Sequence, residues 1–485
     1  MRYLVLIATL TLHLGIVKAA SDDKIPLEFC HIDNFSEEVL CGSYTVEENR
    51  QQPNGRTIDI QVAVLPAVSE AKESDPFVLF AGGPGQGARA MGRYVQAAFR
   101  GVNETRDIVL IDQRGMGDSA PLTCEMPEAD LSTMDSEAAN EAYQQMIKDC
   151  ASNLEADVAQ YTQDIANQDI HDILVALGYD KVNLYGASWG TRSALLYANQ
   201  YPEQVRSVTV DGTAPLSNKV PLYFTRDAEA TIKRLLKDCA EDAGCAEAFA
   251  DLDQRFDDFL NNFPIEGIAT TIADPNTGKL IEVNVSKDAV LGAIRTILYS
   301  PVMTRMLPLA MEKMLANDFR PLAGILSGAG DAGMTLGATL TILCAEEFSR
   351  FTEAEMAERA QDGFEAGTFT KMMYQSCQLW PKVSLPEIYA QTLVQQVPTL
   401  ILSGDLDPVT PPYWGEEMKV HFPNSMHLIA PNTGHNVAPA GCAKDLIAEF
   451  VTTTQFDGID ASCLDDIQRP TFFLNSSGPV GRASE

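Results

Sequence analysis

The chain has 485 residues, of which 45% are apolar and 21% charged, as is typical of a globular protein. Its 67 acidic residues outnumber 35 basic ones, so the formal net charge is −32. A chain this negative repels phosphate backbones and anionic lipids, which argues against a nucleic-acid partner and against docking on a membrane surface. The surplus acid either favours cationic ligands or serves as a solvated surface. The length fits two or three domains, or one large fold with an inserted lobe.

Residues 1–20 have the pattern of a secretory signal peptide. Arg2 precedes an apolar run over 4–17, and the small residues Ala19, Ala20 and Ser21 follow. The run is about 14 residues long, whereas a membrane span needs about 20, so we expect cleavage after Ala19 rather than a membrane anchor. The pattern therefore predicts a secreted or periplasmic protein.

Ten cysteines occur as pairs of sequence neighbours: Cys30 and Cys41, Cys124 and Cys150, Cys239 and Cys245, Cys344 and Cys377, and Cys442 and Cys463. Disulfides persist in exported proteins, so we expect five local bridges. Buried free thiols are the alternative, because sequence alone does not fix connectivity. The absence of CxxC spacing argues against zinc ribbons and thioredoxin-type redox motifs.

Strand and helix patterns alternate through the first part of the chain. Residues 57–64 alternate at period two, which indicates a half-exposed strand. Continuous apolar runs at 77–80 and 107–111 are typical of parallel strands covered on both faces. Further along, the pattern predicts a helix over 164–177, a strand over 182–185, a helix over about 191–200 and a strand over 205–210.

From about residue 215 to about residue 386 helical patterns dominate, at 227–238, 247–263 and 353–363, with one hairpin over 268–285. Alternation then resumes with strands at 397–402 and 426–429 and a helix over about 442–452. This order predicts a mostly parallel sheet with helices on both faces and a helical insertion. We divide the chain into the signal peptide 1–20, a first core segment 21–214, a mainly helical lid 215–386 and a second core segment 387–485.

A G-x-S-x-G motif, Gly186-Ala187-Ser188-Trp189-Gly190, lies between a predicted strand and a predicted helix. That context is the one in which the motif forms a tight turn and presents the serine above a sheet. Glycines at the flanks fit the tight turn. We therefore expect Ser188 to be a nucleophile rather than an ordinary turn serine.

A serine hydroxyl needs a base, and on this architecture the chain order is serine, acid, histidine. His435 follows the last predicted strand in a loop and is the expected base. Asp405 and Asp407 both follow the strand at 397–402, and we favour Asp407 as the acid that orients the imidazole. Asp405 is then a loop-capping residue.

The loop Gly82-Gly83-Pro84-Gly85 follows the strand at 77–80 and should supply one oxyanion donor. Pro84 has no N–H, so we expect the Gly83 N–H to act together with that of Trp189. The glycines also mimic a dinucleotide-binding loop, but the spacing is not G-x-G-x-x-G and no GK[ST] follows. No H-E-x-x-H motif is present, and the Asp274–Gly278 stretch is a hairpin turn rather than a calcium loop, so neither a metal nor a cofactor is expected.

The joint order of these motifs resembles the α/β-hydrolase exopeptidases of the prolyl iminopeptidase and tripeptidyl aminopeptidase group. The matching segments are Ala81-Gly82-Gly83-Pro84-Gly85, the Asp112-Gln113-Arg114-Gly115 run, the Ser188 motif, Asp407 to Pro411, and Gly434-His435. Ala81 replaces the histidine of prolyl iminopeptidases, and the length, leader and cysteines are more similar to the secreted tripeptidyl branch. The resemblance implies an α/β-hydrolase fold with a helical lid, and release of residues from a free peptide N-terminus.

An exopeptidase of this kind must bind an α-ammonium group. The Leu343-Cys344-Ala345-Glu346-Glu347 stretch resembles an acidic motif of the tripeptidyl group, which makes Glu346 the candidate amine anchor; the alternative is a solvated helical face. Arg114 is interpreted as a structural salt-bridge residue beneath its loop.

These observations predict a secreted serine exopeptidase that acts on peptides with a free N-terminus and has no nucleic-acid partner or membrane anchor. Two alternatives stay open: a carboxylester hydrolase with the same triad, and a non-catalytic binding module on a hydrolase scaffold. The number of residues released, the preferred side chains and the oligomeric state do not follow from the sequence.

Overall fold

The computed structural model describes residues 24–125, 136–273, 277–327, 333–390, 393 and 396–479. The expected signal peptide lies outside these ranges, as do Asp274, Pro275 and Asn276 of the expected turn. The core is a nine-stranded sheet with the strand order β1-β2-β3-β5-β4-β6-β7-β10-β11. The strands are β1 (Glu28–Cys30), β2 (Val39–Glu47), β3 (Thr57–Leu65), β4 (Phe77–Phe80), β5 (Ile108–Ile111), β6 (Val182–Ala187), β7 (Val205–Asp211), β10 (Thr399–Gly404) and β11 (Ser425–Ala430).

The sheet is parallel from β5 to β11 and antiparallel at its β1–β2–β3 edge. Every residue of β4, β5, β6 and β10 is buried, which explains their continuous apolar sequences. The expected mostly parallel sheet of an α/β-hydrolase is therefore confirmed. The antiparallel strands β1 and β2 carry no clear alternation and were not predicted.

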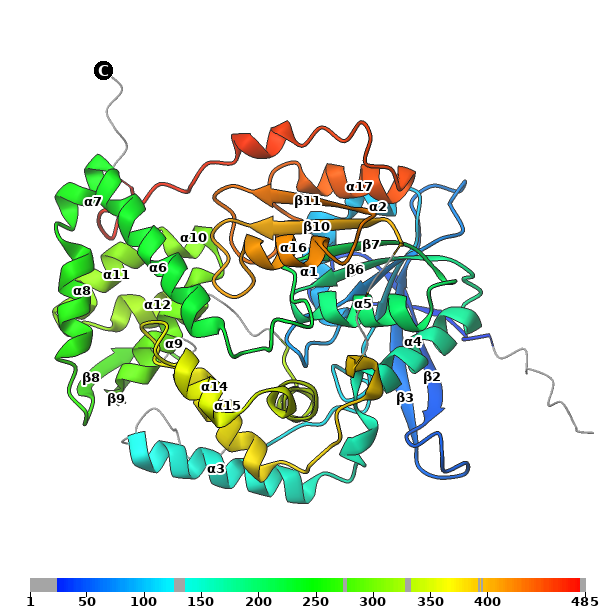
Figure 1. The fold of residues 1–485 in the computed structure, drawn as a ribbon, viewed down its shortest axis with the longest axis horizontal. Coiled ribbons are helices and arrows are strands. Elements are labelled where there is room, and N and C mark those ends of the chain that lie inside the picture. Colours follow the sequence, from blue (N-terminus) through cyan, green and yellow to red (C-terminus); the bar gives the residue numbers. More distant parts are fainter. Residues whose placement is uncertain are drawn as a thin grey trace, which may run out of the picture.

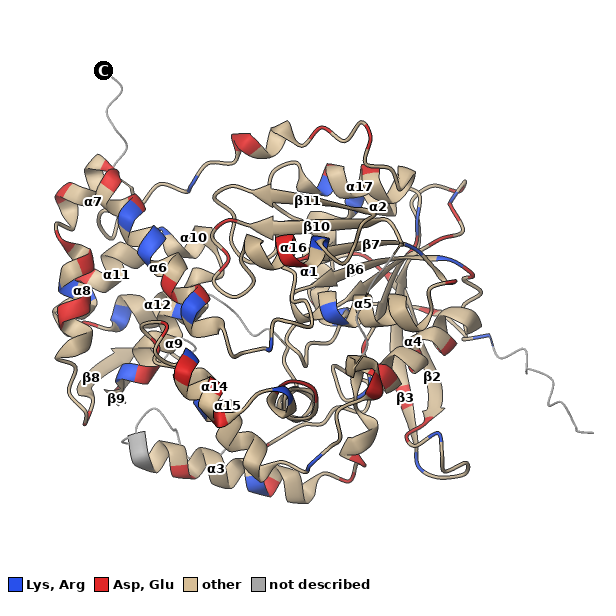
Figure 2. Ribbon diagram, in the orientation of Figure 1, with Lys and Arg blue, Asp and Glu red and all other residues tan. Residues whose placement is uncertain are grey.

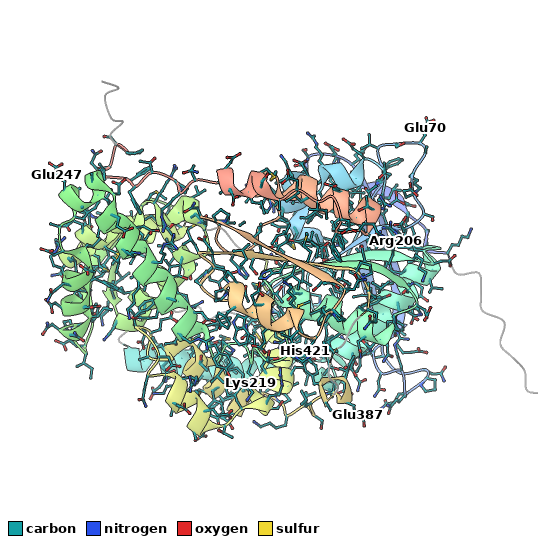
Figure 3. All side chains as sticks on the ribbon, turned by 45° about the horizontal axis from the view of Figure 1, so that its top comes forward. Glu70, Arg206, Lys219, Glu247, Glu387 and His421 are labelled. Carbon is teal, nitrogen blue, oxygen red and sulfur yellow. A yellow bond between two sulfur atoms is a disulfide. The ribbon has the colours of Figure 1, made fainter. Side chains whose placement is uncertain are left out.

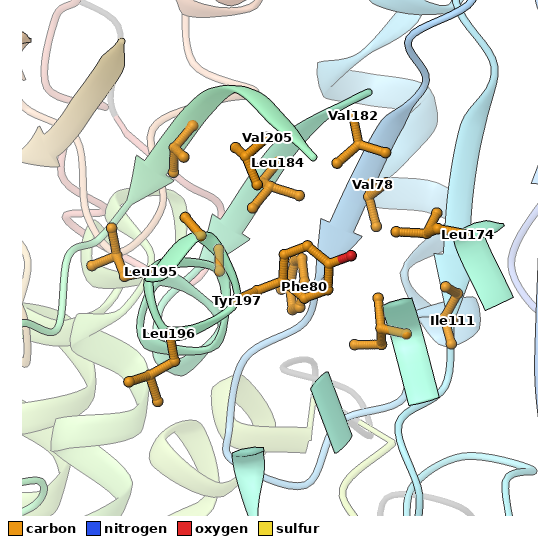
Figure 4. Packing of buried hydrophobic residues seen from close by; sticks show 14 of the residues in the cluster. Val78, Phe80, Ile111, Leu174, Val182, Leu184, Leu195, Leu196, Tyr197 and Val205 are labelled. Carbon is orange, nitrogen blue, oxygen red and sulfur yellow. The ribbon is translucent and has the colours of Figure 1, made fainter. Parts of the chain in front are cut away.

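Helices cover both faces of the sheet, and alternate strand residues point to opposite sides. Val78 and Phe80 of β4 pack with residues of α4 (Gln163–Ala176) and α5 (Trp189–Gln200). Figure 4 shows this cluster, in which Phe80 lies beside Tyr197 of α5. The other β4 side chains, Phe77 and Leu79, pack with α1 (Gly92–Ala98), α2 (Arg100–Asn103) and α17 (Ala443–Thr453).

The lobe between β7 and β10 is mainly helical, as expected, and lies beside the sheet (Figure 1). Its helices are α6 (Phe224–Glu241), α7 (Ala243–Ala248), α8 (Leu252–Asn261), α9 (Lys287–Leu298), α10 (Pro301–Thr304), α11 (Leu307–Leu315), α12 (Arg320–Ser327), α13 (Leu336–Ile342), α14 (Glu353–Arg359) and α15 (Thr368–Leu379). The hairpin is present as β8 (Ile268–Ala273) and β9 (Leu280–Val285). The helix expected over 247–263 is divided into α7 and α8, because Asp251 adopts a left-handed conformation, with a φ of 52°, between them.

Two segments outside 215–386 also pack against the lobe. Met146 and Ile147 of α3 (Ser136–Asn153) belong to one cluster with Met373 and Trp380. Near the C-terminus, Phe472 belongs to the apolar core of the lobe. The lobe is therefore completed by segments on both sides of it in the sequence.

All five expected disulfides are present, and they pair all ten cysteines. Charged residues are distributed over both the core and the lobe (Figure 2), and Glu70, Glu247 and Glu387 lie exposed at the periphery (Figure 3). Within the described ranges, no helix combines the length and the apolar character that a membrane crossing requires.

Candidate active site

Ser188 occupies the turn between β6 and α5 in a strained conformation. Its φ and ψ are 55° and −123°, a region that costs a non-glycine residue about 1–3 kcal/mol. The flanking glycines are required by close contacts: a Cβ on Gly186 would lie 2.4 Å from the carbonyl oxygen of Gly190, and one on Gly190 would lie 2.1 Å from that of Phe80. Helix α5 begins at Trp189, two residues earlier than expected. The serine therefore caps a helix at the carboxyl end of the sheet.

His435 and Asp407 meet in the loops that follow β11 and β10. The Nδ1 atom of His435 lies 2.7 Å from Oδ2 of Asp407. The same oxygen accepts a hydrogen bond from the Thr410 hydroxyl at 2.8 Å, while Oδ1 accepts the backbone N–H groups of Val409 and Thr410 at 2.9 and 2.8 Å. The aspartate is thus held by its own loop and oriented toward the imidazole.

Asp405 occupies a different environment from Asp407. Its Oδ2 lies 3.9 Å from Nη1 of Arg234 on α6, and its backbone N–H donates to Ala430. The structure therefore brings Asp407, and not Asp405, to His435. The other described histidines have other neighbours: His427 meets Glu416 and Ser403, His171 meets Gln204 and Tyr201, and His31 meets Glu38. His421 is exposed at the end of α16 (Pro412–Lys419).

Asp407 and His435 each shift the pKa of the other. Burial alone would raise the pKa of Asp407, but the charge and hydrogen bond of His435, with the N–H groups of Thr410 and Val409, lower it below its usual value. Burial alone would lower the pKa of His435, but Asp407 and the more distant charge of Asp211 raise it above the ordinary 6.5. A protonated imidazole is therefore stabilised at this position.

Ser188 and the His435 loop meet at the end of β7. The N–H of Ser188 donates to the carbonyl oxygen of Asp211 at 2.8 Å, and Nδ2 of Asn436 donates to the same oxygen at 3.0 Å. A Cβ on Gly212 would lie 3.0 Å from Cε1 of His435. The described hydrogen bonds include none between the Ser188 hydroxyl and His435; in hydrolases this bond often tightens only with substrate present.

The loop that follows β4 lies against the serine turn. A Cβ on Gly82 would lie 3.2 Å from Cβ of Ser188, and Gly83 has a φ of 110°. Trp189 is the first residue of α5, where backbone N–H groups have no partner within the helix. Gly83 and Trp189 therefore belong to the two segments that border Ser188, as an oxyanion site requires.

The lobe contacts this site at two places. Above the glycine loop, the N–H of Thr335 donates to the Gly85 carbonyl at 2.9 Å and the hydroxyl of Thr339 donates to that of Pro84 at 2.7 Å. On the histidine side, the carbonyl of Tyr299 accepts the N–H of His435 at 3.0 Å, and the two rings lie edge to face. The lobe therefore holds both the glycine loop and the histidine loop.

Glu346 and Glu347 lie in a π-helical turn, Leu343–Glu347, that follows α13, and both side chains are fully buried. Oε1 of Glu346 accepts the N–H of Gln163 at 2.7 Å, and Oε2 accepts the hydroxyl of Tyr389. Burial raises the pKa of Glu346 to about 8. To bind a substrate ammonium, Glu346 would have to lose its proton and exchange one of these partners.

Glu347 pairs with Arg192 of α5 and with Arg350. The Arg192 guanidinium also lies over the Trp189 ring at 4.6 Å, so the π turn is linked to the helix that follows Ser188. Arg114 forms a bidentate pair with Asp169 at 2.6 and 2.8 Å and is buried, which confirms its interpretation as a structural residue.

Two family profiles match the chain: the alpha/beta hydrolase fold at residues 75–243, which contains Gly83 and Ser188, and the TAP-like protein at residues 362–463, which contains Asp407 and His435. The chain therefore has the α/β-hydrolase fold. The described sheet and its covering helices agree with this fold. The second match shows that the C-terminal part of this hydrolase is similar to TAP-like proteins.

Curated relatives of this α/β-hydrolase include peptidases. The serine protease Hip1 of Mycobacterium tuberculosis is 24% identical over 458 residues, which cover 87% of this chain and 85% of that protein. The tripeptidyl aminopeptidase of Streptomyces lividans is 27% identical over 230 residues, 44% of this chain and 43% of that protein. A solved proline iminopeptidase from Mycobacterium smegmatis aligns over 84% of this chain and 97% of its own at 14% identity, with a TM-score of 0.37. The curated relatives confirm the resemblance to the prolyl iminopeptidase and tripeptidyl aminopeptidase group.

Several residues of the hydrolase site were not predicted from the sequence. Thr410, three residues after Asp407, binds both oxygens of that carboxylate, and a polar residue at this spacing is a signal for an Asx-type turn. Asp211 directly follows the strand predicted over 205–210, at the sheet edge where catalytic groups gather, which is a weaker signal. Nothing in the local sequence around Tyr299 indicated its contact with His435.

Proposed function

We propose that this α/β-hydrolase is a secreted serine exopeptidase that releases short peptides, tripeptides in particular, or single residues from free peptide N-termini. The observation that carries the proposal is the hydrogen bond between Asp407 and His435 at the sheet edge where the strained Ser188 lies. The tripeptidyl aminopeptidase and proline iminopeptidase relatives support an N-terminal substrate.

In the proposed reaction, Ser188 Oγ attacks the scissile carbonyl carbon while Nε2 of His435 takes the hydroxyl proton. Asp407 keeps Nδ1 protonated and stabilises the imidazolium. The N–H groups of Gly83 and Trp189 bind the oxyanion. His435 then protonates the leaving amine, and a water molecule, deprotonated by the same imidazole, hydrolyses the acyl-enzyme.

The lobe would limit how much of the peptide enters before the cut. It contacts the glycine loop through Thr335 and Thr339 and the histidine loop through Tyr299, so it borders the site on two sides. Glu346 stays our candidate for the substrate ammonium. Secretion is supported by the five disulfides, which persist in oxidising compartments; N-terminal sequencing of the exported protein would test cleavage after Ala19.

A fluorophosphonate probe tests the nucleophile. We expect covalent labelling of the wild-type protein and none of Ser188→Ala; labelling that persists in this variant would contradict the assignment. An unlabelled wild-type protein would instead favour a non-catalytic module.

Peptide products test the substrate class. An unblocked peptide and its N-acetylated form are incubated with the protein, and the released di- and tripeptides are quantified. We expect release from the unblocked peptide alone. Turnover of short acyl esters without any peptide cleavage would favour the carboxylester hydrolase.

A further inference from the structure

Asp211, the last residue of β7, has no role in the proposed triad, although its carboxylate is fully buried beside it. One oxygen accepts the N–H of Val437 at 2.6 Å and the other accepts that of Ala438 at 2.8 Å. The hydroxyl of Tyr185 donates to the second oxygen at 2.7 Å, and that of Tyr94 lies 3.2 Å from it. The side chain therefore holds the backbone of Val437 and Ala438, the two residues that follow His435 and Asn436, by hydrogen bonds.

The main chain of Asp211 holds the other half of the site. Its carbonyl oxygen accepts the N–H of Ser188 and the side-chain amide of Asn436. One residue thus joins the serine turn, through its backbone, to the histidine loop, through both backbone and side chain. A displacement of this residue would change the separation between Ser188 and His435.

The carboxylate also acts on the imidazole by its charge. The negative charge of Asp211 favours protonated His435, as does the nearer Asp407. The ionisable groups facing Asp211 are Tyr94 of α1, Tyr185 of β6 and His435 itself. Burial raises the pKa of Asp211, while the two backbone N–H groups and Tyr185 oppose that rise.

We propose that Asp211 is a positioning residue for His435: it fixes the loop that carries the imidazole against the serine turn and supplies a second negative charge to the imidazolium formed in the reaction. The proposal rests on the proposed function, because it requires His435 to take the proton of Ser188. Asp211 itself touches neither the reacting atoms nor the substrate.

Asp211→Asn tests this role, with Asp107→Asn as the matched control. Asp107 is also buried and also accepts a tyrosine hydroxyl, that of Tyr179, and a backbone N–H, that of Ala67, but it precedes β5 at the opposite end of the sheet. Each full-length variant is titrated with a fluorophosphonate, and turnover of p-nitrophenyl acetate is expressed per active site.

For Asp211→Asn we expect kcat to fall by about 10- to 1,000-fold at a similar KM, because His435 is a less effective general base when it is poorly positioned. We also expect the acid limb of the kcat/KM profile to move to lower pH, because the protonated imidazole loses a stabilising negative charge. Asp107→Asn should lose thermal stability without either change. A wild-type kcat and pH profile in Asp211→Asn, with only a lower melting temperature, would overturn the proposal.

If Asp211→Asn yields no folded protein, the same measurements are made on Tyr185→Phe. This variant removes one hydroxyl donor from the Asp211 carboxylate and retains the aromatic ring. A fall in kcat per titrated site at constant KM, with a shifted acid limb, supports the role of Asp211, and an unchanged profile overturns it. If the probe does not label the wild-type protein, the proposed function itself is overturned. If the wild type is labelled and Asp211→Asn is fully active, only the role of Asp211 is overturned.

Discussion

Two aspartates in one loop have different environments although a single residue separates them. Asp407 is fully engaged by Thr410, Val409 and His435, whereas Asp405 turns toward Arg234 of the lobe. The sequence made both of them candidates for the acid, because both follow the same buried strand. The difference arises from the turn after Gly404, whose geometry the sequence pattern does not specify.

Asp407→Asn should lower kcat by about 10³- to 10⁴-fold, because an amide at this position favours the wrong tautomer of His435. Asp405→Asn is the matched control and should change kcat only slightly. Both are measured as turnover per titrated site. A larger loss in Asp405→Asn than in Asp407→Asn would contradict the assignment of the acid.

The raised pKa of His435 predicts a pH dependence of activity. The imidazole accepts a proton only when it is neutral, so kcat/KM should fall as the pH falls through a pKa above the ordinary 6.5. The measurement is a kcat/KM profile on an ester without ionisable groups. A profile that stays flat down to pH ~5 would show that no base of this kind limits the reaction.

The buried strands were predictable and the buried acidic turn of the lobe was not, for a physical reason. In β4 and β5 every side chain is buried, so a short apolar run signals the element by itself. The π turn at Leu343–Glu347 is different, since its two acidic side chains are buried only because Gln163, Tyr389 and Arg192 approach from distant parts of the chain. Two adjacent acidic residues at this point in the sequence would look the same on a solvated helical face, because the local sequence does not contain those partners.

Glu346 should make the stability of this turn depend on pH. Its pKa is about 8 in the folded protein against 4.5 when exposed, so its stabilising contribution is complete below pH 4.5 and is lost as the pH rises through about 8. Glu346→Gln stays neutral throughout. We expect the free energy of unfolding of the wild type to fall relative to the variant by about 1.4 kcal/mol per pH unit over this interval.

Denaturant unfolding of both proteins at several pH values provides the measurement. A difference that does not vary with pH would show that Glu346 is ionised in the folded protein. The same variant tests the amine anchor: if its preference for a free-amino peptide over the acetylated form is unchanged, Glu346 does not have that role.

The net charge of −32 acts over the whole surface and should attract cationic peptides. For a peptide with additional lysines we expect KM to rise with salt concentration, because ions screen charges over about 8 Å at physiological ionic strength. A neutral peptide of the same length is the control and should show little change. Equal salt dependence of the two peptides would mean that the surface charge does not contribute to substrate capture.

The C-terminal segment connects the core to the lobe across the molecule, as Figure 1 shows. It leaves the core after the Cys442–Cys463 disulfide; Nε of Arg469 then lies 3.2 Å from Asp238 of α6, and Phe472 enters the apolar core of the lobe. The next side chain, Phe473, is only partly buried and lies under the Arg305 guanidinium. The segment should therefore stabilise the lobe mainly through Phe472.

Phe472→Ala should lower the free energy of unfolding by about 3–5 kcal/mol, because it leaves a cavity in the lobe, and should increase cleavage of the lobe in limited proteolysis. Phe473→Ala, the adjacent control, removes a half-exposed ring and should cost clearly less. Denaturant unfolding and proteolysis of the two variants measure this difference. An equally small loss in both variants would mean that the buried ring does not hold the segment, because the main-chain hydrogen bond from the Phe473 N–H to the Arg305 carbonyl remains in both.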